Sequence, residues 1–234
     1  MKKRIDLILP CYNPDEGWER QVVSKYKDLQ KVWEELDFHL YIVNDGSVSG
    51  FGKTTVDYLA SKISDVHIIS YSKNRGKGFA LREAVKLCHS DYMVYTDYDF
   101  PYTESSMSCV IKALLDGFDV VVAERGNDYS ASLPLSRRLI SVFFRFCNRC
   151  LLRMEYPDTQ AGLKGFNRRG RKVFLATWIE TYLFDWEFIY KSCKEAALNV
   201  TAVPIKLREN VCFSPIGIVS CLMELKFFLK KMQI

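Results

Sequence analysis

The sequence contains no uninterrupted apolar stretch of about 18 residues, the length that a membrane-spanning helix requires. We therefore expect no segment to cross a membrane. The first apolar run, residues 5–9, directly follows Met1-Lys2-Lys3-Arg4. It is too short for a signal peptide, and it lacks the small-residue cleavage site. We expect the protein to stay in the cytoplasm.

Cysteine and histidine are present but too scattered to define a site. The eight cysteines stand singly, without the dense spacing of a disulfide-stabilised domain, which favours a reducing compartment. Cys147 and Cys150 form a C-x-x-C pair, but no second pair follows and the three histidines lie far away, so we expect no zinc site. The net charge of +5 is too small to indicate nucleic-acid binding.

What the chain does contain is an alternation of short apolar runs with helix-like segments. The apolar runs cover residues 5–9, 38–43, 66–71, 91–96 and 118–123, with helix-like segments such as 17–36 and 78–88 between them. This order predicts βαβ units, and therefore an α/β fold with a mostly parallel sheet flanked by helices. Ligands of such sheets bind at the carboxyl ends of the strands.

Two carboxylates, Asp97 and Asp99, follow the apolar run 91–96. In extended backbone, residues i and i+2 project to the same side, so the two side chains can converge where the strand leaves the sheet. Paired carboxylates suit a hard cation such as Mg²⁺ or Mn²⁺ that bridges substrate phosphates. Turn formation alone would also explain an isolated pair, because Asp is common in turns.

Polar clusters follow three other predicted strands as well. In chain order the four clusters are Pro10-Cys11-Tyr12-Asn13, Asn44-Asp45-Gly46-Ser47, Ser72-Lys73-Asn74-Arg75-Gly76-Lys77-Gly78 and Asp97-Tyr98-Asp99. In a parallel sheet all four fall on one edge, where they supply an aromatic face, acceptors, a cationic loop and paired carboxylates. Each could be a plain turn by itself. Together they suit a nucleotide with its phosphates.

In order and spacing, these motifs resemble the family 2 glycosyltransferases, which have the GT-A nucleotide-diphospho-sugar transferase fold. The resemblance covers nearly the whole chain and includes Asp158-Thr159-Gln160-Ala161-Gly162-Leu163-Lys164 and Phe184-Asp185-Trp186-Glu187. The first of these two segments is similar to one in polyprenyl-phosphate sugar transferases of the dolichyl-phosphate β-glucosyltransferase and mannose synthase type. The resemblance implies a catalytic domain over residues 1–210.

The resemblance also implies roles for individual residues. Asp97 and Asp99 would bind Mg²⁺ or Mn²⁺ and, with Asp185, form the catalytic set. The donor, a nucleoside diphosphate sugar, would be bound by Pro10, Tyr12, Asn13, Asn44, Asp45, Lys77 and Asp97. The family usually carries an acid where this chain has Asn44. UDP-glucose is the favoured donor and GDP-mannose the second, with inversion at the anomeric carbon.

The acceptor decides whether a base is needed. A polyprenyl phosphate, with a second pKa near about 6, is already anionic at neutral pH and needs positioning more than deprotonation. A sugar hydroxyl, the alternative acceptor in glycan biosynthesis, would need a general base, for which Asp185 is the candidate. Asp185 could instead be a helix N-terminal acid that interacts with the dipole.

Cationic and amide side chains are the candidates for holding an acceptor phosphate. By similarity these are Arg125, Arg137, Arg138 and Gln160. Arginine offers the bidentate geometry that phosphate favours, although a solvated charged face is the plain alternative.

Two segments could contact a membrane. On a helical projection of Leu135–Met154, Arg138, Arg145, Arg149 and Arg153 form one stripe opposite an apolar face. Such a helix can lie on an anionic membrane surface or pack on the core. Residues 211–234 form a second candidate, a C-terminal amphipathic helix with Ser214 as its N-cap and Pro215 at its first helical position. We expect a peripheral protein on the cytoplasmic face of a membrane.

Two rival functions come from other classes. A dinucleotide-binding oxidoreductase would use Gly76-Lys77-Gly78 after a strand and Asp97 about 20 residues later. The third glycine of that motif is replaced by Leu81. A non-catalytic sugar-nucleotide-binding module is the other rival, and the presence of Asp97, Asp99 and Asp185 speaks against it.

Overall fold

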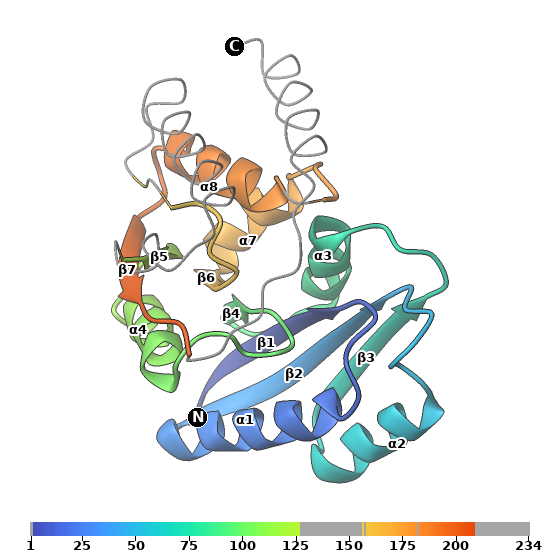
Figure 1. Ribbon diagram of the computed structural model, residues 1–234. Helices are drawn as coiled ribbons and strands as arrows, with labels where there is room; N and C mark the ends of the chain where they lie inside the picture. The colour runs from blue at the N-terminus through green and yellow to red at the C-terminus, as the bar shows by residue number, and fades with distance from the viewer. Residues whose placement is uncertain (1, 127–155, 157, 182, 209–234) are drawn as a thin grey trace.

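The structure is a computed structural model that describes residues 2–126, 156, 158–181 and 183–208 (Figure 1). Arg137, Arg138, the predicted helix 135–154 and the predicted helix 211–234 lie outside the described residues. None of the helices in the described part is long and apolar enough to cross a membrane.

A seven-stranded sheet forms the centre of the described part, in the order β3-β2-β1-β4-β6-β5-β7. All neighbouring strands are parallel except where β6 pairs with β4 and β5. The predicted α/β class is therefore confirmed. The strands are β1 (Lys3–Cys11), β2 (Leu36–Asp45), β3 (Val66–Tyr71), β4 (Tyr92–Tyr95), β5 (Val120–Arg125), β6 (Lys164–Asn167) and β7 (Val200–Ile205).

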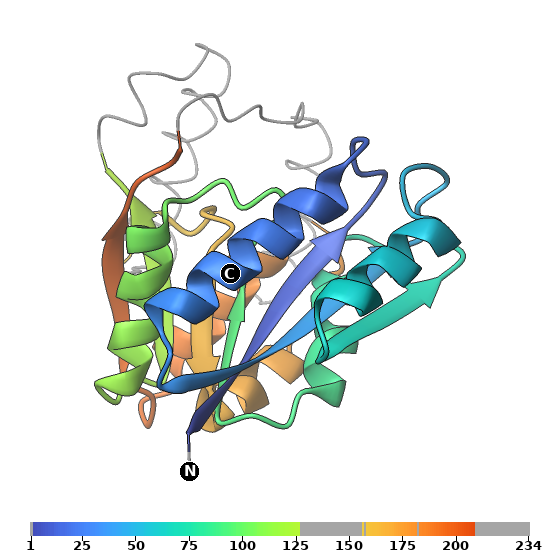
Figure 2. The same cartoon turned by 90° about the horizontal axis from the view of Figure 1, so that it is seen from below.

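Helices cover both faces of this sheet (Figures 1 and 2). One face packs against α1 (Trp18–Val32), α2 (Lys53–Lys62) and α4 (Glu104–Leu115). The other packs against α3 (Lys77–Leu87), α7 (Arg168–Leu175) and α8 (Phe184–Lys194). The central strands are therefore buried on both sides, which explains why they read as continuous apolar runs in the sequence.

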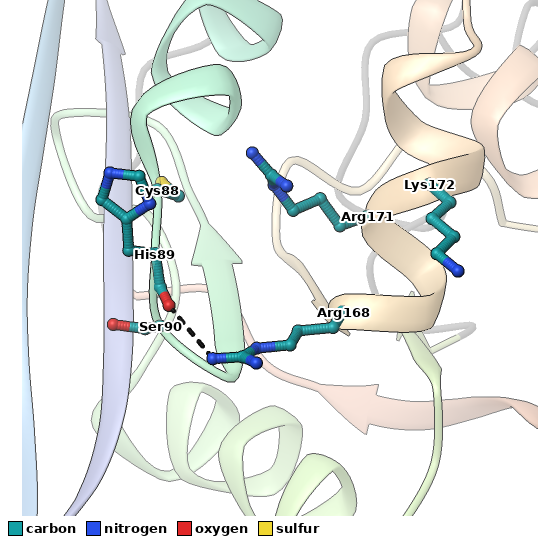
Figure 3. Close-up of a pocket in the computed structure, with 6 residues that line it drawn as sticks. All are labelled: Cys88, His89, Ser90, Arg168, Arg171 and Lys172. Atoms are coloured by element: carbon teal, nitrogen blue, oxygen red, sulfur yellow. Dashed lines mark hydrogen bonds between the residues drawn. The ribbon is translucent and has the colours of Figure 1, made fainter.

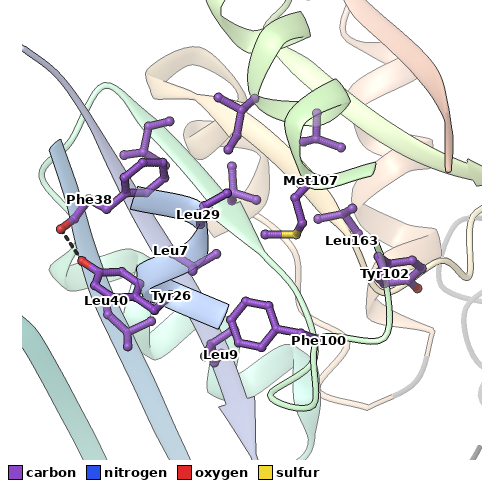
Figure 4. Packing of buried hydrophobic residues seen from close by; sticks show 14 of the residues in the cluster. Leu7, Leu9, Tyr26, Leu29, Phe38, Leu40, Phe100, Tyr102, Met107 and Leu163 are labelled. Carbon is purple, nitrogen blue, oxygen red and sulfur yellow. Dashed lines mark hydrogen bonds between the residues drawn. The ribbon is translucent and has the colours of Figure 1, made fainter. Parts of the chain in front are cut away.

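Strand β1 shows how the pattern directs side chains into two cores. Leu7 and Leu9 pack on the α1 side, whereas Ile8 packs on the α3 side, and all three are fully buried. Figure 4 shows Leu7 and Leu9 in one cluster with Tyr26 and Phe100. Burial of each Leu or Ile contributes about 1.5–3 kcal/mol, which makes this strand a rigid support for the loop that follows it.

The short antiparallel strand β6, which the sequence pattern did not predict, lies between β4 and β5. Its register pairs Tyr95 with Lys164. Residues 158–163 precede β6, so they run beside the segment that follows β4. Ala161 and Leu163 are fully buried in the α1-side core and fix this segment to the domain (Leu163 is labelled in Figure 4).

Candidate active site

The carboxyl ends of β1, β2, β3 and β4 lie on one edge of the sheet, because these strands are parallel. The four polar clusters predicted from the sequence lie at these ends, the first two beginning within the last residues of β1 and β2 and the other two following β3 and β4. The structure thus confirms that they share an edge, which is the edge where ligands bind in open α/β sheets.

The two carboxylates of the D-x-D pair lie on a turn. Strand β4 ends at Tyr95, and the amide of Phe100 donates a hydrogen bond to the carbonyl of Asp97 over 3.0 Å. Phe100 has φ 48° and its ring is buried in the core. The backbone between Asp97 and Asp99 is therefore a turn, with Tyr98 and Asp99 at its centre, and not the extended strand end that the sequence predicts.

Asp99 is partly buried on this turn. Burial and the neighbouring charge of Asp97 raise the pKa of Asp99 to about 6. Its Oδ1 atom is buried and accepts no hydrogen bond from the described residues. A buried carboxylate oxygen without a donor is costly unless a ligand completes it, and a divalent cation fits this need.

Lys77 neutralises the other carboxylate. It begins α3, and its Nζ lies 2.7 Å from Asp97 Oδ1. Burial lowers the pKa of Lys77, but the charges of Asp97, Asp185 and Asp99 outweigh burial and raise it above its usual value. The ammonium is therefore permanently charged beside the carboxylates, in a position to contact a phosphate.

Gly162 packs its backbone against the Asp97 carboxylate and near the Lys77 ammonium. A Cβ atom at Gly162 would lie 2.2 Å from Asp97 Oδ2 and 3.2 Å from Lys77 Nζ. Only glycine allows the backbone of segment 158–164 to approach the carboxylate so closely. The same segment contributes Gln160, whose Nε2 is buried and donates to none of the described residues. Among the described residues, the D-x-D turn thus has an acceptor without a donor and segment 158–164 has a donor without an acceptor, as a metal and a phosphate would require.

Asp185 lies in the first turn of α8, close enough to Lys77 for its charge to raise the pKa of that lysine, and its side chain is 7% exposed. Its Oδ1 accepts a hydrogen bond from the Tyr95 hydroxyl at 2.6 Å and lies 2.9 Å from Lys164 Nζ. Lys164 is fully buried, and burial lowers its pKa while Asp185 partly offsets that effect. In the sequence, Lys164 is distinguished only as the last residue of the motif at 158–164.

The residues predicted to bind the base and ribose divide into two groups. Tyr12 is 47% exposed and Pro10 half-buried, so both remain accessible. Asn13, Asn44 and Asp45 instead use their side chains within the protein. Asn13 Oδ1 accepts a hydrogen bond from the Val48 amide at 2.8 Å, and Asn44 Oδ1 accepts one from the Ser47 amide at 2.9 Å. The Asp45 carboxylate accepts hydrogen bonds from the amides of Arg75 and Gly76, both at 2.8 Å.

The Gly76-Lys77-Gly78 loop supports a neighbouring loop of the protein. The Glu180 carbonyl accepts hydrogen bonds from the amides of Gly78 at 2.7 Å and Phe79 at 3.2 Å. A Cβ at Gly76 would lie 2.6 Å from that same carbonyl oxygen. These amides are the ones that would cradle a pyrophosphate in a dinucleotide-binding fold. Because they are already bonded, the geometry speaks against the oxidoreductase.

Arg125 is the described member of the predicted acceptor-phosphate arginines. Its Nε and Nη2 donate to the Asp158 carboxylate over 2.7 and 2.6 Å. The charge of Arg125 and its hydrogen bonds hold the pKa of Asp158 below its usual value, although burial acts in the opposite direction. The pair ties the end of β5 to segment 158–164 and was not predicted from the sequence.

A cavity of about 410 Å³ lies at the opposite edge of the sheet (Figure 3). Its lining includes Arg168, Arg171 and His89. Arg168 pairs with Asp91 at 3.0 Å, and Arg171 donates to the carbonyls of Val85 and Lys86 at the end of α3. These cations are already complemented, so the cavity is separate from the candidate site and carries no assignment.

The described residues contain no cluster of three or more metal-ligating side chains. Asp97 and Asp99 fit a cation that completes its coordination with phosphate oxygens and water, as Mg²⁺ commonly does. A mostly parallel sheet with this site on its carboxyl edge is the arrangement of a GT-A glycosyltransferase. Residues 6–174 match the model of glycosyl transferase family 2, and the chain belongs to that family.

Similar sequences include two dolichyl-phosphate β-glucosyltransferases. The one from Dictyostelium discoideum is 25% identical over 221 residues, which cover 85% of this chain and 67% of the relative. The one from Homo sapiens is 25% identical over 202 residues, which cover 80% of this chain and 62% of the relative. The chain therefore spans about two thirds or less of the length of these relatives.

Solved structures show the same fold at lower identity. Glucosyl-3-phosphoglycerate synthase from Mycobacterium tuberculosis, in complex with Mn²⁺, UDP and glucosyl-3-phosphoglycerate, superimposes with a TM-score of 0.65 at 16% identity, covering 99% of this chain and 81% of that one. Mannosyl-3-phosphoglycerate synthase from Rubrobacter xylanophilus gives a TM-score of 0.67 at 15% identity, covering 95% and 70%. These likenesses confirm the predicted GT-A fold.

Proposed function

We propose that the protein transfers a sugar from a nucleoside diphosphate sugar to a polyprenyl phosphate, with inversion at the anomeric carbon. UDP-glucose is the favoured donor and GDP-mannose the second. The observation that carries the transferase site is the buried Asp99 Oδ1, which has no hydrogen-bond donor in the described part of the chain and lies near the Lys77–Asp97 ion pair. The names of the dolichyl-phosphate relatives support the lipid acceptor.

In the proposed reaction, an oxygen of the acceptor phosphate attacks the anomeric carbon of the donor sugar. At the same time, the bond between that carbon and the β-phosphate oxygen of the donor breaks. The acceptor monoester is already ionised, so no proton must be removed. The nucleoside diphosphate leaves with the bonding electron pair. Stabilising the charge that develops on that leaving group is therefore the main chemical task.

Asp97 and Asp99 would hold a divalent cation, either Mg²⁺ or Mn²⁺. Such an ion supplies Lewis-acid stabilisation of the diphosphate. Lys77 adds a fixed positive charge 2.7 Å from Asp97, and the exposed Tyr12 ring offers a surface on which a base can stack. Gln160 Nε2 offers a buried donor for a phosphate oxygen.

The test is incubation of the protein with Mn²⁺, a polyprenyl phosphate and, in separate reactions, UDP-glucose and GDP-mannose. The expected product is a lipid-phosphate sugar that forms with one donor and is absent without metal. Transfer only to free or lipid-linked sugar hydroxyls would instead support the alternative acceptor. Binding of donor without any transfer would favour a non-catalytic module.

A lipid acceptor must be met at a bilayer, so we also propose a peripheral location on the cytoplasmic face of a membrane. Each Lys or Arg near an anionic surface contributes on the order of 1 kcal/mol, and salt weakens the attraction. Co-sedimentation with anionic liposomes at low and high salt tests this, and equal recovery with neutral and anionic liposomes would contradict it.

A further inference from the structure

A buried ion pair links β6 to the start of α8, next to the candidate site. Lys164 is fully buried, and Asp185 Oδ1 lies 2.9 Å from its ammonium. The Tyr95 hydroxyl donates to the same oxygen over 2.6 Å. Taking an ammonium out of water is costly, and hydrophobic residues of similar volume are often at least as stabilising. A charged pair in this position therefore calls for a specific role.

The contacts of Lys164 lead to the D-x-D turn. Besides Asp185, its ammonium donates to the Ala161 carbonyl. Ala161 is followed by Gly162, whose backbone packs against Asp97 so closely that a Cβ would overlap the carboxylate. Lys164 thus joins the N-terminal turn of α8 to the short segment that supports Asp97.

Tyr95, on the neighbouring strand β4, also contacts this ion pair. Tyr95 pairs with Lys164 in the antiparallel register of β4 and β6, and it is the last residue of β4 before Asp97. Its ring is fully buried among Phe166, Phe174 and Phe184. The hydroxyl is therefore held rigidly toward Asp185.

Asp185 is poorly placed for a general base. A base must come within hydrogen-bond distance of the proton that it removes, directly or through one water. The Asp185 side chain is 7% exposed, and its Oδ1 is already engaged by both Tyr95 and Lys164. These contacts are those of a structural anchor.

We infer that Lys164, Asp185 and Tyr95 form a positioning unit that holds Gly162 against Asp97, and that Asp185 takes no proton from the acceptor. The inference rests on the proposed function, because it assigns these residues to the same metal and donor site. It deepens that proposal by restricting the acceptor to groups that arrive ionised, such as a phosphate monoester.

The experiment compares Asp185→Asn, Lys164→Met and Tyr95→Phe in the full chain, with the exposed Lys112→Met as the matched control. Binding of Mn²⁺ with UDP is measured by titration calorimetry. We expect Lys164→Met and Asp185→Asn to weaken this binding about tenfold or more, Tyr95→Phe a few-fold, and Lys112→Met not at all. Because no acceptor is present, this readout stands even if the acceptor is not a polyprenyl phosphate.

A second measurement separates positioning from proton transfer. At saturating metal and donor, we expect Asp185→Asn to retain most of kcat and the same pH profile as the wild type. Loss of turnover in Asp185→Asn with unchanged Mn²⁺–UDP affinity would overturn the inference, since that is the behaviour of a base.

Folding is the remaining control, because loss of one member of a buried pair can unfold a protein. Thermal melts of Lys164→Met, Asp185→Asn and the double variant Lys164→Met/Asp185→Asn are compared. We expect the double variant to be less destabilised than the sum of the single ones. If both single variants fail to fold, Tyr95→Phe decides, since unchanged Mn²⁺–UDP affinity in that variant would contradict the positioning role.

Discussion

The loops after β1, β2 and β3 and the turn after β4 occupy the same edge of the sheet but treat their polar atoms in opposite ways. In the first region, Asn13, Asn44 and Asp45 use their side chains to bond the neighbouring loops. In the second, Asp99 Oδ1 has no donor among the described residues. A satisfied polar atom stabilises the scaffold, whereas an unsatisfied buried one marks where a ligand is expected.

Charge separates the same two regions. Around the turn after β4, the Lys77–Asp97 and Lys164–Asp185 pairs lie beside the partly buried Asp99. By contrast, the side chains of Asn13, Asn44 and Asp45 accept hydrogen bonds from neutral backbone amides. We therefore expect substitutions after β4 to affect chemistry, and substitutions of Asn13, Asn44 and Asp45 to affect mainly stability.

The largest expected effect is that of Asp99→Asn. Loss of one charge and one metal ligand should reduce metal-dependent turnover about a thousandfold, the order found when a transition-state stabiliser is removed. The fold should survive, because burial penalises the Asp99 charge. Turnover at a matched Mn²⁺ concentration and a thermal melt test this. Near-normal activity would show that Asp99 does not bind the metal.

Gly162→Ala should have the next largest effect. Its Cβ would lie 2.2 Å from Asp97 Oδ2, so the carboxylate must move. A displacement of about 1 Å can reduce the rate about a hundredfold. The matched control is Gly52→Ala, where a Cβ meets nothing within 4 Å. Similar activity of both variants would mean that activity does not depend on the exact position of the Asp97 carboxylate.

Much of this contrast was not readable in the sequence. Alternating apolar runs predicted the strands, and the polar clusters after them were expected on one edge, because parallel strands impose that arrangement. Lys164 and Asp185 are 21 positions apart in the chain, and Lys164 belongs to β6, a strand of four residues. Such short strands give almost no periodic signal. The turn that carries the two carboxylates ends at Phe100, and the burial of Phe100 likewise depends on tertiary packing.

The pH dependence of metal binding sharpens the comparison. Burial and Asp97 raise the pKa of Asp99 to about 6, so a proton competes with the metal below that pH. We expect the dissociation constant for Mn²⁺ to rise up to about tenfold per pH unit below about pH 6, and to level off above it. Calorimetric titration at several pH values measures this, and a flat profile from pH 5 to 7 (about one unit each side of that pKa) would contradict the assignment.

Stability should respond to the same carboxyl in the opposite sense. Because the pKa of Asp99 is higher in the folded protein than its usual 3.8, the protonated form is favoured by folding. Its contribution to stability is fully present below about pH 4 and is lost as the pH rises through about 6. Asn does not titrate, so the Asp99→Asn variant lacks this pH dependence. Comparing thermal melts of the variant and the wild type at several pH values therefore isolates the contribution of Asp99.

The smallest expected effect is that of Asn44→Asp, which introduces the acid that the family usually carries. Asn44 donates to Ser70 Oγ at 2.7 Å and accepts from the Ser47 amide at 2.9 Å. An aspartate can keep the second bond, and the Ser70 hydroxyl can rotate to donate to it. We therefore expect the donor KM to change less than about threefold, equivalent to under about 1 kcal/mol. A change above about tenfold with an unaltered thermal melt would show that residue 44 contacts the donor directly, and the contrast between the two regions would then fail at this position.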